Sequence, residues 1–179
     1  MAEGCFTGPL LGLFVMKTLF LLRHAKAESG SPGVEDSKRA LTDSGRAQAQ
    51  TVGQFASQQK LNFELVLSSP ALRAAQTVQL VLQAASPAGG VRYDDRIYDA
   101  SLAILVEVIS AIPDDINSVL VVGHNPGLEE FLRLLTNRAE HMSTATLAQI
   151  SSEVETWANI IGSGATLDRL VRPKEPGRG

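Results

Sequence analysis

Two histidines and two arginines of this sequence stand where short apolar runs end. Arg23 and His24 come directly after the run at 18–22, and His124 follows a similar run one hundred residues later. Arg73 lies close behind a third run, one turn into a helical pattern. Guanidinium groups match phosphate oxygens in pairs, and imidazole nitrogens donate or accept protons near neutral pH. Each group alone could be an ordinary surface or turn residue, but together they indicate a site for a phosphate-like anion.

Prolines mark the start of two of the helices that follow these runs. Pro70 comes after Ser69, and Pro126 comes after His124 and Asn125. Proline is favoured at the first position of a helix, whose N-terminal N–H groups and positive dipole end attract anions. We therefore expect helices that begin at both prolines and direct their N-termini toward the same anion.

Apolar runs alternate with helical patterns over most of the chain, which predicts repeated strand–helix units. The expected strands cover residues 18–22, 63–67, 91–98, 118–122, 146–151 and 157–161. The expected helices cover residues 43–59, with Thr42 as the cap, and then 70–85, 102–112 and 126–135. This pattern predicts the α/β class, as a three-layer α/β/α sandwich with a mainly parallel central sheet. Parallel strands end at one edge, so the histidines and arginines should converge there.

Composition restricts the classes of function. With 179 residues, 44% apolar and 20% charged, the chain suits one ordinary globular domain. Its formal net charge of −3 gives no general attraction to nucleic acid or to an anionic membrane. The single cysteine, Cys5, rules out an intrachain disulfide, and together these features favour a cytoplasmic protein.

The chain divides into three segments by composition. Residues 1–15 contain an apolar stretch too short to span a membrane and lack the basic start of a secretory signal, so we interpret them as an N-terminal extension. Residues 16–171 should form a single domain. Residues 172–179 are rich in proline, glycine and charge, which is typical of a disordered tail.

Three motifs in order make the sequence resemble the histidine phosphatase superfamily. They are Leu-Arg-His-Ala at 22–25, Ser-Pro-Ala-Leu-Arg-Ala-Ala-Gln-Thr at 69–77, and Gly-His at 123–124. The Gly-His-Asn-Pro-Gly turn at 123–127 and Arg39 make it most similar to the small bacterial phosphohistidine phosphatases. Ala25 departs from the wider family, which usually has glycine there, but this removes no reacting atom.

The resemblance implies a role for each of these side chains and a phosphoglycerate mutase-like fold. His24 would be the nucleophile, Arg23 and Arg73 would hold the phosphoryl oxygens, His124 would donate to them, and Arg39 would be an additional ligand. No metal or other cofactor is implied, since the arginines can stabilise the transferred charge. His24 would need a neutral ring with one nitrogen donating to a backbone carbonyl, whereas His124 would work better protonated.

Asp99 has two interpretations. The resemblance places an acidic residue in this region, where it would protonate an ester leaving group as a general acid. Alternatively, Asp99 is a solvated or helix-capping residue ahead of Leu102. His141 and Glu129 are expected to be solvated surface residues.

Short connections suggest the kind of substrate. Only 25 residues separate Arg73 from Asp99, and 24 separate Asp99 from His124, which leaves no room for a lid. An open site favours phosphohistidine on a protein as the substrate. The alternatives are a phosphatase of a small phosphate ester or phosphoanhydride and, from another class, a non-catalytic phosphate-binding module. The sequence leaves the oligomeric state open.

Overall fold

The computed structural model describes residues 15–30, 32–85 and 89–173. The expected extension at 1–15 and tail at 172–179 therefore lie almost wholly outside the described residues, as does Cys5. The first strand, β1, begins at Val15, and the last, β6, ends at Val171. The division of the chain at residues 15 and 171 stays a prediction.

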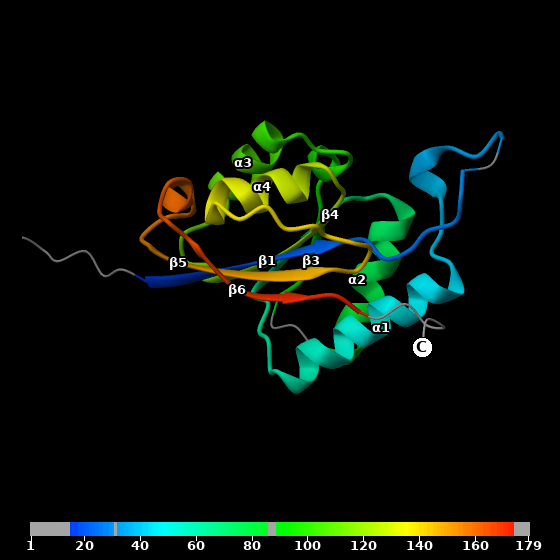
Figure 1. Ribbon diagram of the computed structural model, residues 1–179, viewed down its shortest axis with the longest axis horizontal. Coiled ribbons are helices and arrows are strands. Elements are labelled where there is room, and N and C mark those ends of the chain that lie inside the picture. Colours follow the sequence, from blue (N-terminus) through cyan, green and yellow to red (C-terminus); the bar gives the residue numbers. More distant parts are fainter. Residues whose placement is uncertain (1–14, 31, 86–88, 174–179) are drawn as a thin grey trace, which may run out of the picture.

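Six strands form one sheet in the order β3-β2-β4-β1-β5-β6 (Figure 1). They are β1 (Val15–Arg23), β2 (Leu65–Ser68), β3 (Val91–Tyr93), β4 (Ser118–Gly123), β5 (Leu147–Val154) and β6 (Thr166–Val171). Strands β3, β2, β4 and β1 run parallel, whereas β5 is antiparallel to β1 and β6 is antiparallel to β5. The sheet is mixed rather than mainly parallel as expected.

The antiparallel direction of β5 follows from a tertiary contact at the end of β1. After the last α-helix the chain runs back along the molecule to the carboxyl end of β1, where the Ala145 N–H donates to the carbonyl oxygens of Arg23 (3.1 Å) and His24 (3.2 Å). Strand β5 therefore begins beside the end of β1 and must run in the opposite direction. This return also closes one side of the site.

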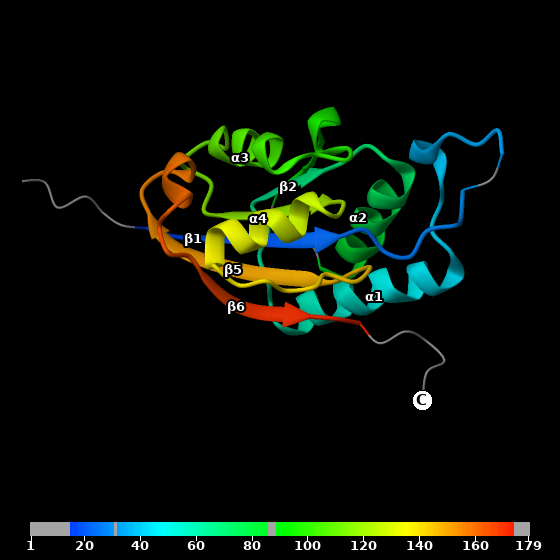
Figure 2. The same ribbon diagram turned by 45° about the horizontal axis from the view of Figure 1, so that its top comes forward.

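Helices cover both faces of the sheet, which confirms the three-layer sandwich (Figures 1 and 2). Helices α1 (Asp43–Gln58) and α2 (Leu72–Ala84) pack on one face, and α3 (Leu102–Ser110) and α4 (Gly127–Thr136) on the other. Alternate side chains of β1 enter the two cores, Leu19 and Leu21 on the α3–α4 side and Phe20 and Leu22 on the α1–α2 side. Among the described residues, no helix is long and apolar enough to cross a membrane.

Helix starts agree with the sequence only in part. The Thr42 hydroxyl accepts a hydrogen bond from the Gly45 N–H (3.0 Å), so the predicted cap of α1 is confirmed. Helix α2 begins at Leu72 and not at Pro70, because Ala71 still has a non-helical backbone (φ −54°, ψ 135°) and serves as the N-cap. Helix α4 begins at Gly127, with Pro126 as its N-cap.

The largest errors concern the end of the chain and the region after β2. The expected strand at 157–161 is a 3-10 helix, η3 (Trp157–Ile160), whose buried indole N–H donates to the Ile116 carbonyl (2.8 Å). Strand β6 was not foreseen, because it lies at the sheet edge and buries little of its surface. The expected strand at 91–98 is only three residues long and is followed by a second 3-10 helix, η2 (Asp95–Ile97).

Candidate active site

A cavity of about 650 Å³ opens at the carboxyl edge of the parallel strands. Polar and charged side chains line most of it. All six residues singled out in the sequence contribute to its walls: Arg23, His24, Arg39, Arg73, Asp99 and His124. The convergence expected from the strand–helix pattern is therefore found, although their chemical roles stay predictions.

His24 is held at the end of β1 by the sheet itself. Its N–H donates to the Gly123 carbonyl (3.1 Å), and its ring Nδ1 lies 2.8 Å from the Ala25 carbonyl oxygen. A carbonyl oxygen can only accept, so Nδ1 carries the proton. Burial lowers the pKa of His24 to about 4, helped by the positive charges of Arg73, Arg23 and Arg39 and opposed by the Ala25 hydrogen bond. At neutral pH the ring is therefore neutral, with the lone pair on Nε2.

His124 lies across the cavity at the end of β4, with its ring centroid 5.0 Å from that of His24. Its Nε2 is 2.8 Å from the hydroxyl of Ser69, whereas Nδ1 is buried without a partner among the described residues. Burial, followed by the electrostatic influence of His24 and Arg73, lowers the pKa of His124 to about 3. The ring of His124 is therefore neutral at pH 7 in this structure and can donate from only one nitrogen, while its protonation with phosphate bound stays a prediction.

Two arginines approach the histidines from different elements. Arg73, in the first turn of α2, donates from Nη1 to the Asp36 backbone carbonyl (2.7 Å) and from Nη2 to its Oδ2 (2.8 Å). Arg23 donates from Nη1 to the Met142 carbonyl (2.8 Å). In both arginines Nε is buried without a partner among the described residues. Each guanidinium is thus held by hydrogen bonds at its tip, while its Nε makes no hydrogen bond to the described residues.

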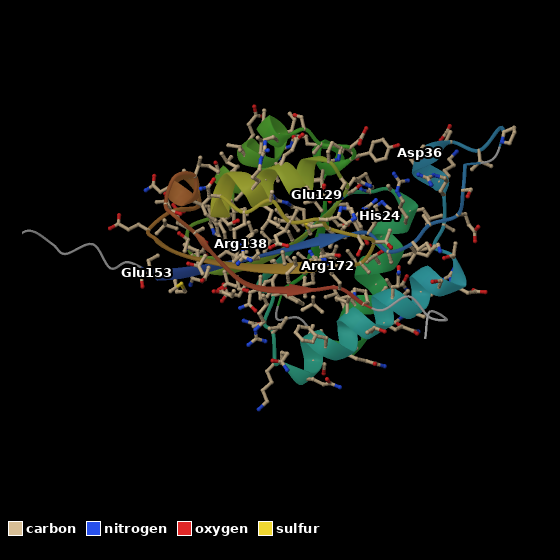
Figure 3. The ribbon with its side chains drawn as sticks, viewed as in Figure 1. His24, Asp36, Glu129, Arg138, Glu153 and Arg172 are labelled. Atoms are coloured by element: carbon tan, nitrogen blue, oxygen red, sulfur yellow. The ribbon has the colours of Figure 1, made fainter. Side chains whose placement is uncertain are left out.

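Asp36 is the site residue that sequence reasoning missed. It starts a short 3-10 helix, η1 (Asp36–Lys38), and Figure 3 shows it beyond His24 on the segment between β1 and α1. Arg39 donates to its Oδ1 from Nε (2.8 Å) and Nη2 (2.6 Å), and the Tyr98 hydroxyl donates to its Oδ2 (2.8 Å). Hydrogen bonds from Tyr98, then from Arg39 and Arg73, lower the pKa of Asp36 to about 2.

Arg39 and Asp99 stand apart from the histidines in their contacts. Arg39 donates to the Asp36 carboxylate from one edge of its guanidinium and to the Glu28 carbonyl (2.8 Å) from Nη1. In this structure its partner is therefore the Asp36 carboxylate. Asp99 is exposed at the cavity wall, with a left-handed backbone (φ 49°). It does not cap α3, because the Ser101 hydroxyl accepts from the Ile104 N–H. Of its two interpretations the capping role is wrong, while an acid or a solvated carboxylate remains.

Glu129 on α4 supports the opposite wall (Figure 3). Its Oε1 accepts from Asn125 Nδ2 (2.7 Å), the Met142 N–H (2.8 Å) and His141 Nδ1 (2.9 Å). The Met142 carbonyl in turn accepts from Arg23. Glu129 is thus a support of the Arg23 wall and not the solvated charge expected, whereas His141 is on the surface as predicted, with 75% of its side chain exposed. The spacing of four between Asn125 and Glu129 in the α4 turn was the available signal.

The described ranges contain no group of three or more His, Cys, Asp or Glu side chains able to hold a metal ion. The metal-free mechanism was inferred from the arginines and stays a prediction.

Comparison with known proteins agrees with these observations. The family model of the histidine phosphatase superfamily (branch 1) matches residues 19–105. An uncharacterised protein of Picosynechococcus sp. strain PCC 7002 is 34% identical over 124 residues, which cover 63% of this chain and 69% of that protein. A candidate phosphohistidine phosphatase SixA from Nakamurella multipartitia is similar in structure, with a TM-score of 0.79 and 28% identity over 89% of this chain and 97% of that one.

A more distant likeness concerns the fold alone. A phosphoglycerate mutase from Plasmodium falciparum has a TM-score of 0.61 and 16% identity over 86% of this chain and 89% of that one. The phosphoglycerate mutase-like fold is thereby confirmed. With the motifs, the family match and the likeness to a SixA structure in agreement, the chain belongs to the histidine phosphatase superfamily, in its SixA-like branch.

Proposed function

We propose that this protein is a metal-independent phosphatase that transfers a phosphoryl group first to His24 and then to water, with phosphohistidine on a protein as its substrate. The observation that carries the proposal is the state of His24. Its Nδ1–H is fixed on the Ala25 carbonyl and its pKa is lowered to about 4, so Nε2 is a free nucleophile at neutral pH. A protonated ring could not attack phosphorus.

The steps follow from the placement of the donors. The Nε2 lone pair of His24 attacks phosphorus while the bond from phosphorus to the substrate imidazole breaks. That imidazole leaves as the neutral base if its other nitrogen carries the proton. In this proposal the guanidinium groups of Arg23 and Arg73 and the ring of His124, which line the cavity, stabilise the phosphoryl oxygens. Water then attacks phospho-His24, which releases inorganic phosphate and restores the neutral ring.

A protein substrate is supported by the short connections around the site. The described residues between Arg73 and His124 are taken up by α2, β3, η2, α3 and β4, which belong to the sandwich. An imidazole leaving group also requires less protonation than an alkoxide, which suits a cavity without a buried carboxylic acid. The likeness to a candidate phosphohistidine phosphatase points the same way.

A small phosphate ester is the second candidate, and Asp99 favours it. This carboxyl group lies at the wall of the same cavity. As a general acid it would protonate the alkoxide that an ester substrate releases. A phosphate-binding protein without turnover is the third candidate. A cytoplasmic location, and no binding to nucleic acid or membranes, are part of the proposal on the basis of the net charge of −3 and the single cysteine.

The test is turnover of a phosphohistidine protein and, separately, of an aryl phosphate ester by the wild type, His24→Ala and the surface control His141→Ala. We expect phosphohistidine turnover that vanishes only in His24→Ala, with slow ester hydrolysis. Fast ester hydrolysis that is lost in Asp99→Asn, with an inert phosphoprotein, would favour the ester phosphatase. Phosphate binding without turnover of either compound would favour the binding module.

A further inference from the structure

The Asp36 carboxylate engages Arg73, which the proposed function assigns to phosphate, and Arg39, which the family resemblance implies as an additional ligand. Its oxygens and backbone carbonyl accept from Nη1 and Nη2 of Arg73 and from Nε and Nη2 of Arg39. For Arg39 this is the forked edge that recognises carboxylates and phosphates in pairs. A phosphoryl group that binds both guanidinium groups must share these donors with Asp36 or displace it.

Of the two residues in the Asp36–Arg73 ion pair, Asp36 is the one that can move away from the contact. The side chain of Arg73 is 6% exposed and fixed in α2, whereas that of Asp36 is 52% exposed. Asp36 sits on the three-residue η1 helix, in which no residue is buried. Little packing is lost when such a side chain turns to solvent. The carboxylate therefore acts as an exchangeable partner of a fixed guanidinium.

The charge of Asp36 also opposes any second anion in the cavity. It is ionised throughout the physiological range, because its pKa is about 2. A unit negative charge several ångströms from a bound anion changes that anion's affinity by about tenfold, at effective dielectric constants between those of a protein surface and water. Removing the charge while keeping an oxygen acceptor for Arg73 should therefore strengthen phosphate binding.

We infer that Asp36 is a specificity-determining residue whose carboxylate competes with phosphate for Arg73 and Arg39, so that the site binds inorganic phosphate, the product of the reaction, only weakly. This inference rests on the proposed function. A protein-borne phosphoryl group would have further contacts outside the cavity, whereas free phosphate depends on the groups of the cavity alone. The competition therefore limits inhibition by product more than it limits binding of substrate.

The experiment measures the dissociation constant of inorganic phosphate, by calorimetry, for the wild type, Asp36→Asn and Asp36→Ser. Asp95→Asn is the matched control, since Asp95 is an exposed acid of η2 with no side-chain hydrogen bond or ion pair among the described residues. We expect the two neutral variants at position 36 to bind phosphate about tenfold more tightly and Asp95→Asn to stay within about twofold of the wild type. The inhibition constant of phosphate in turnover should change in parallel.

The sign of the effect separates competition from a structural role. If Asp36 only held Arg73 in place, both neutral variants would bind phosphate more weakly, and equal or weaker binding in folded variants overturns the inference. Failure of both variants to fold overturns it as well, because Asp36 would then be structural. Wild-type turnover is measured in the same preparations. Its absence would remove the proposed function, whereas turnover with unimproved phosphate binding at position 36 would remove only the role of Asp36.

Discussion

The two walls of the cavity are built in different ways. On the strand side, His24 and His124 follow β1 and β4, and backbone hydrogen bonds of the sheet fix their positions. On the loop side, Asp36 and Arg39 belong to the exposed segment around η1, and Asp36 is joined to Arg73, Arg39 and Tyr98 by hydrogen bonds from their side chains. The difference indicates a division of labour, in which the strand side performs the transfer and the loop side adjusts how strongly anions bind.

Arginine replacements should give the largest contrast between the walls. Arg73→Lys keeps the charge but removes the buried Nε donor, so we expect kcat/KM to fall by at least about a hundredfold. Arg39→Lys, on the loop side, should lower it by no more than about tenfold, since the guanidinium of Arg39 is already engaged with Asp36. Steady-state kinetics on a phosphohistidine protein measures both. An equal loss in the two variants would contradict the division of labour.

Ser69 should give a smaller effect on the strand side. Its hydroxyl oxygen accepts from the Ala71 N–H (3.2 Å) and lies 2.8 Å from His124 Nε2. We infer that its proton is directed to Nε2, which leaves the histidine proton on Nδ1. Ser69→Ala removes this constraint, and we expect roughly a tenfold loss of kcat, the value of one hydrogen bond. Ser68→Ala, at an equally buried neighbour, is the control and should stay within about twofold. A loss as large in Ser68→Ala would assign the effect to packing.

Replacing Glu129 should lower activity less, because Glu129 affects the site only through Met142 and Arg23. Glu129→Ala removes the acceptor of the Met142 N–H and loosens the carbonyl that holds Arg23. We expect kcat/KM to fall about three- to fivefold through imperfect positioning. Glu130→Ala, at the exposed neighbouring position of α4, should leave kcat/KM unchanged. Equal kinetics in the two variants would show that this support is dispensable.

The smallest expected change concerns the protonation of His24 and His124, which should not titrate between pH 7.5 and 5.5. Because the folded pKa values of His24 and His124 are about 4 and 3, both rings stay neutral as the pH falls from 7.5 to 5.5. In the unfolded chain histidine is half protonated near pH 6.5, so acidification through this range favours unfolding, and any loss of stability runs in that direction. NMR of the ring nitrogens checks this. A midpoint near 6.5 for His24 would contradict the account of its neutral ring.

The strand side could be predicted from the sequence, and the reason is local. Continuous apolar runs at 18–22 and 118–122 mark buried strands, and the residue that follows a parallel strand is placed at the sheet edge wherever the rest of the chain goes. His24, His124 and Arg73 were found on that basis together with the family resemblance. The error at Pro70 shifted the start of α2 by two residues without moving Arg73 out of its first turn.

The loop side could not be predicted, because its contacts are not local. Asp36 and Arg73 are 37 positions apart, and Asp36 and Tyr98 are 62 apart. No periodicity in the η1 segment signals which exposed acid will face an arginine of α2. The spacing of three between Asp36 and Arg39 was visible, but it is equally typical of a solvated pair. The antiparallel direction of β5, whose strand was predicted, and the edge strand β6 were missed for a similar reason, since tertiary pairing decides them.

The central claim is that Nε2 of His24 carries the phosphoryl group during turnover. The most direct measurement mixes the wild type with a phosphohistidine protein, quenches at millisecond times in base, and locates the phosphoryl group by mass spectrometry and by its 31P NMR shift. The account predicts an acid-labile, base-stable phosphoryl group on His24, attached at Nε2 because Nδ1 is engaged with the Ala25 carbonyl. A phosphoryl group on another residue, or turnover that persists in His24→Ala, would contradict it.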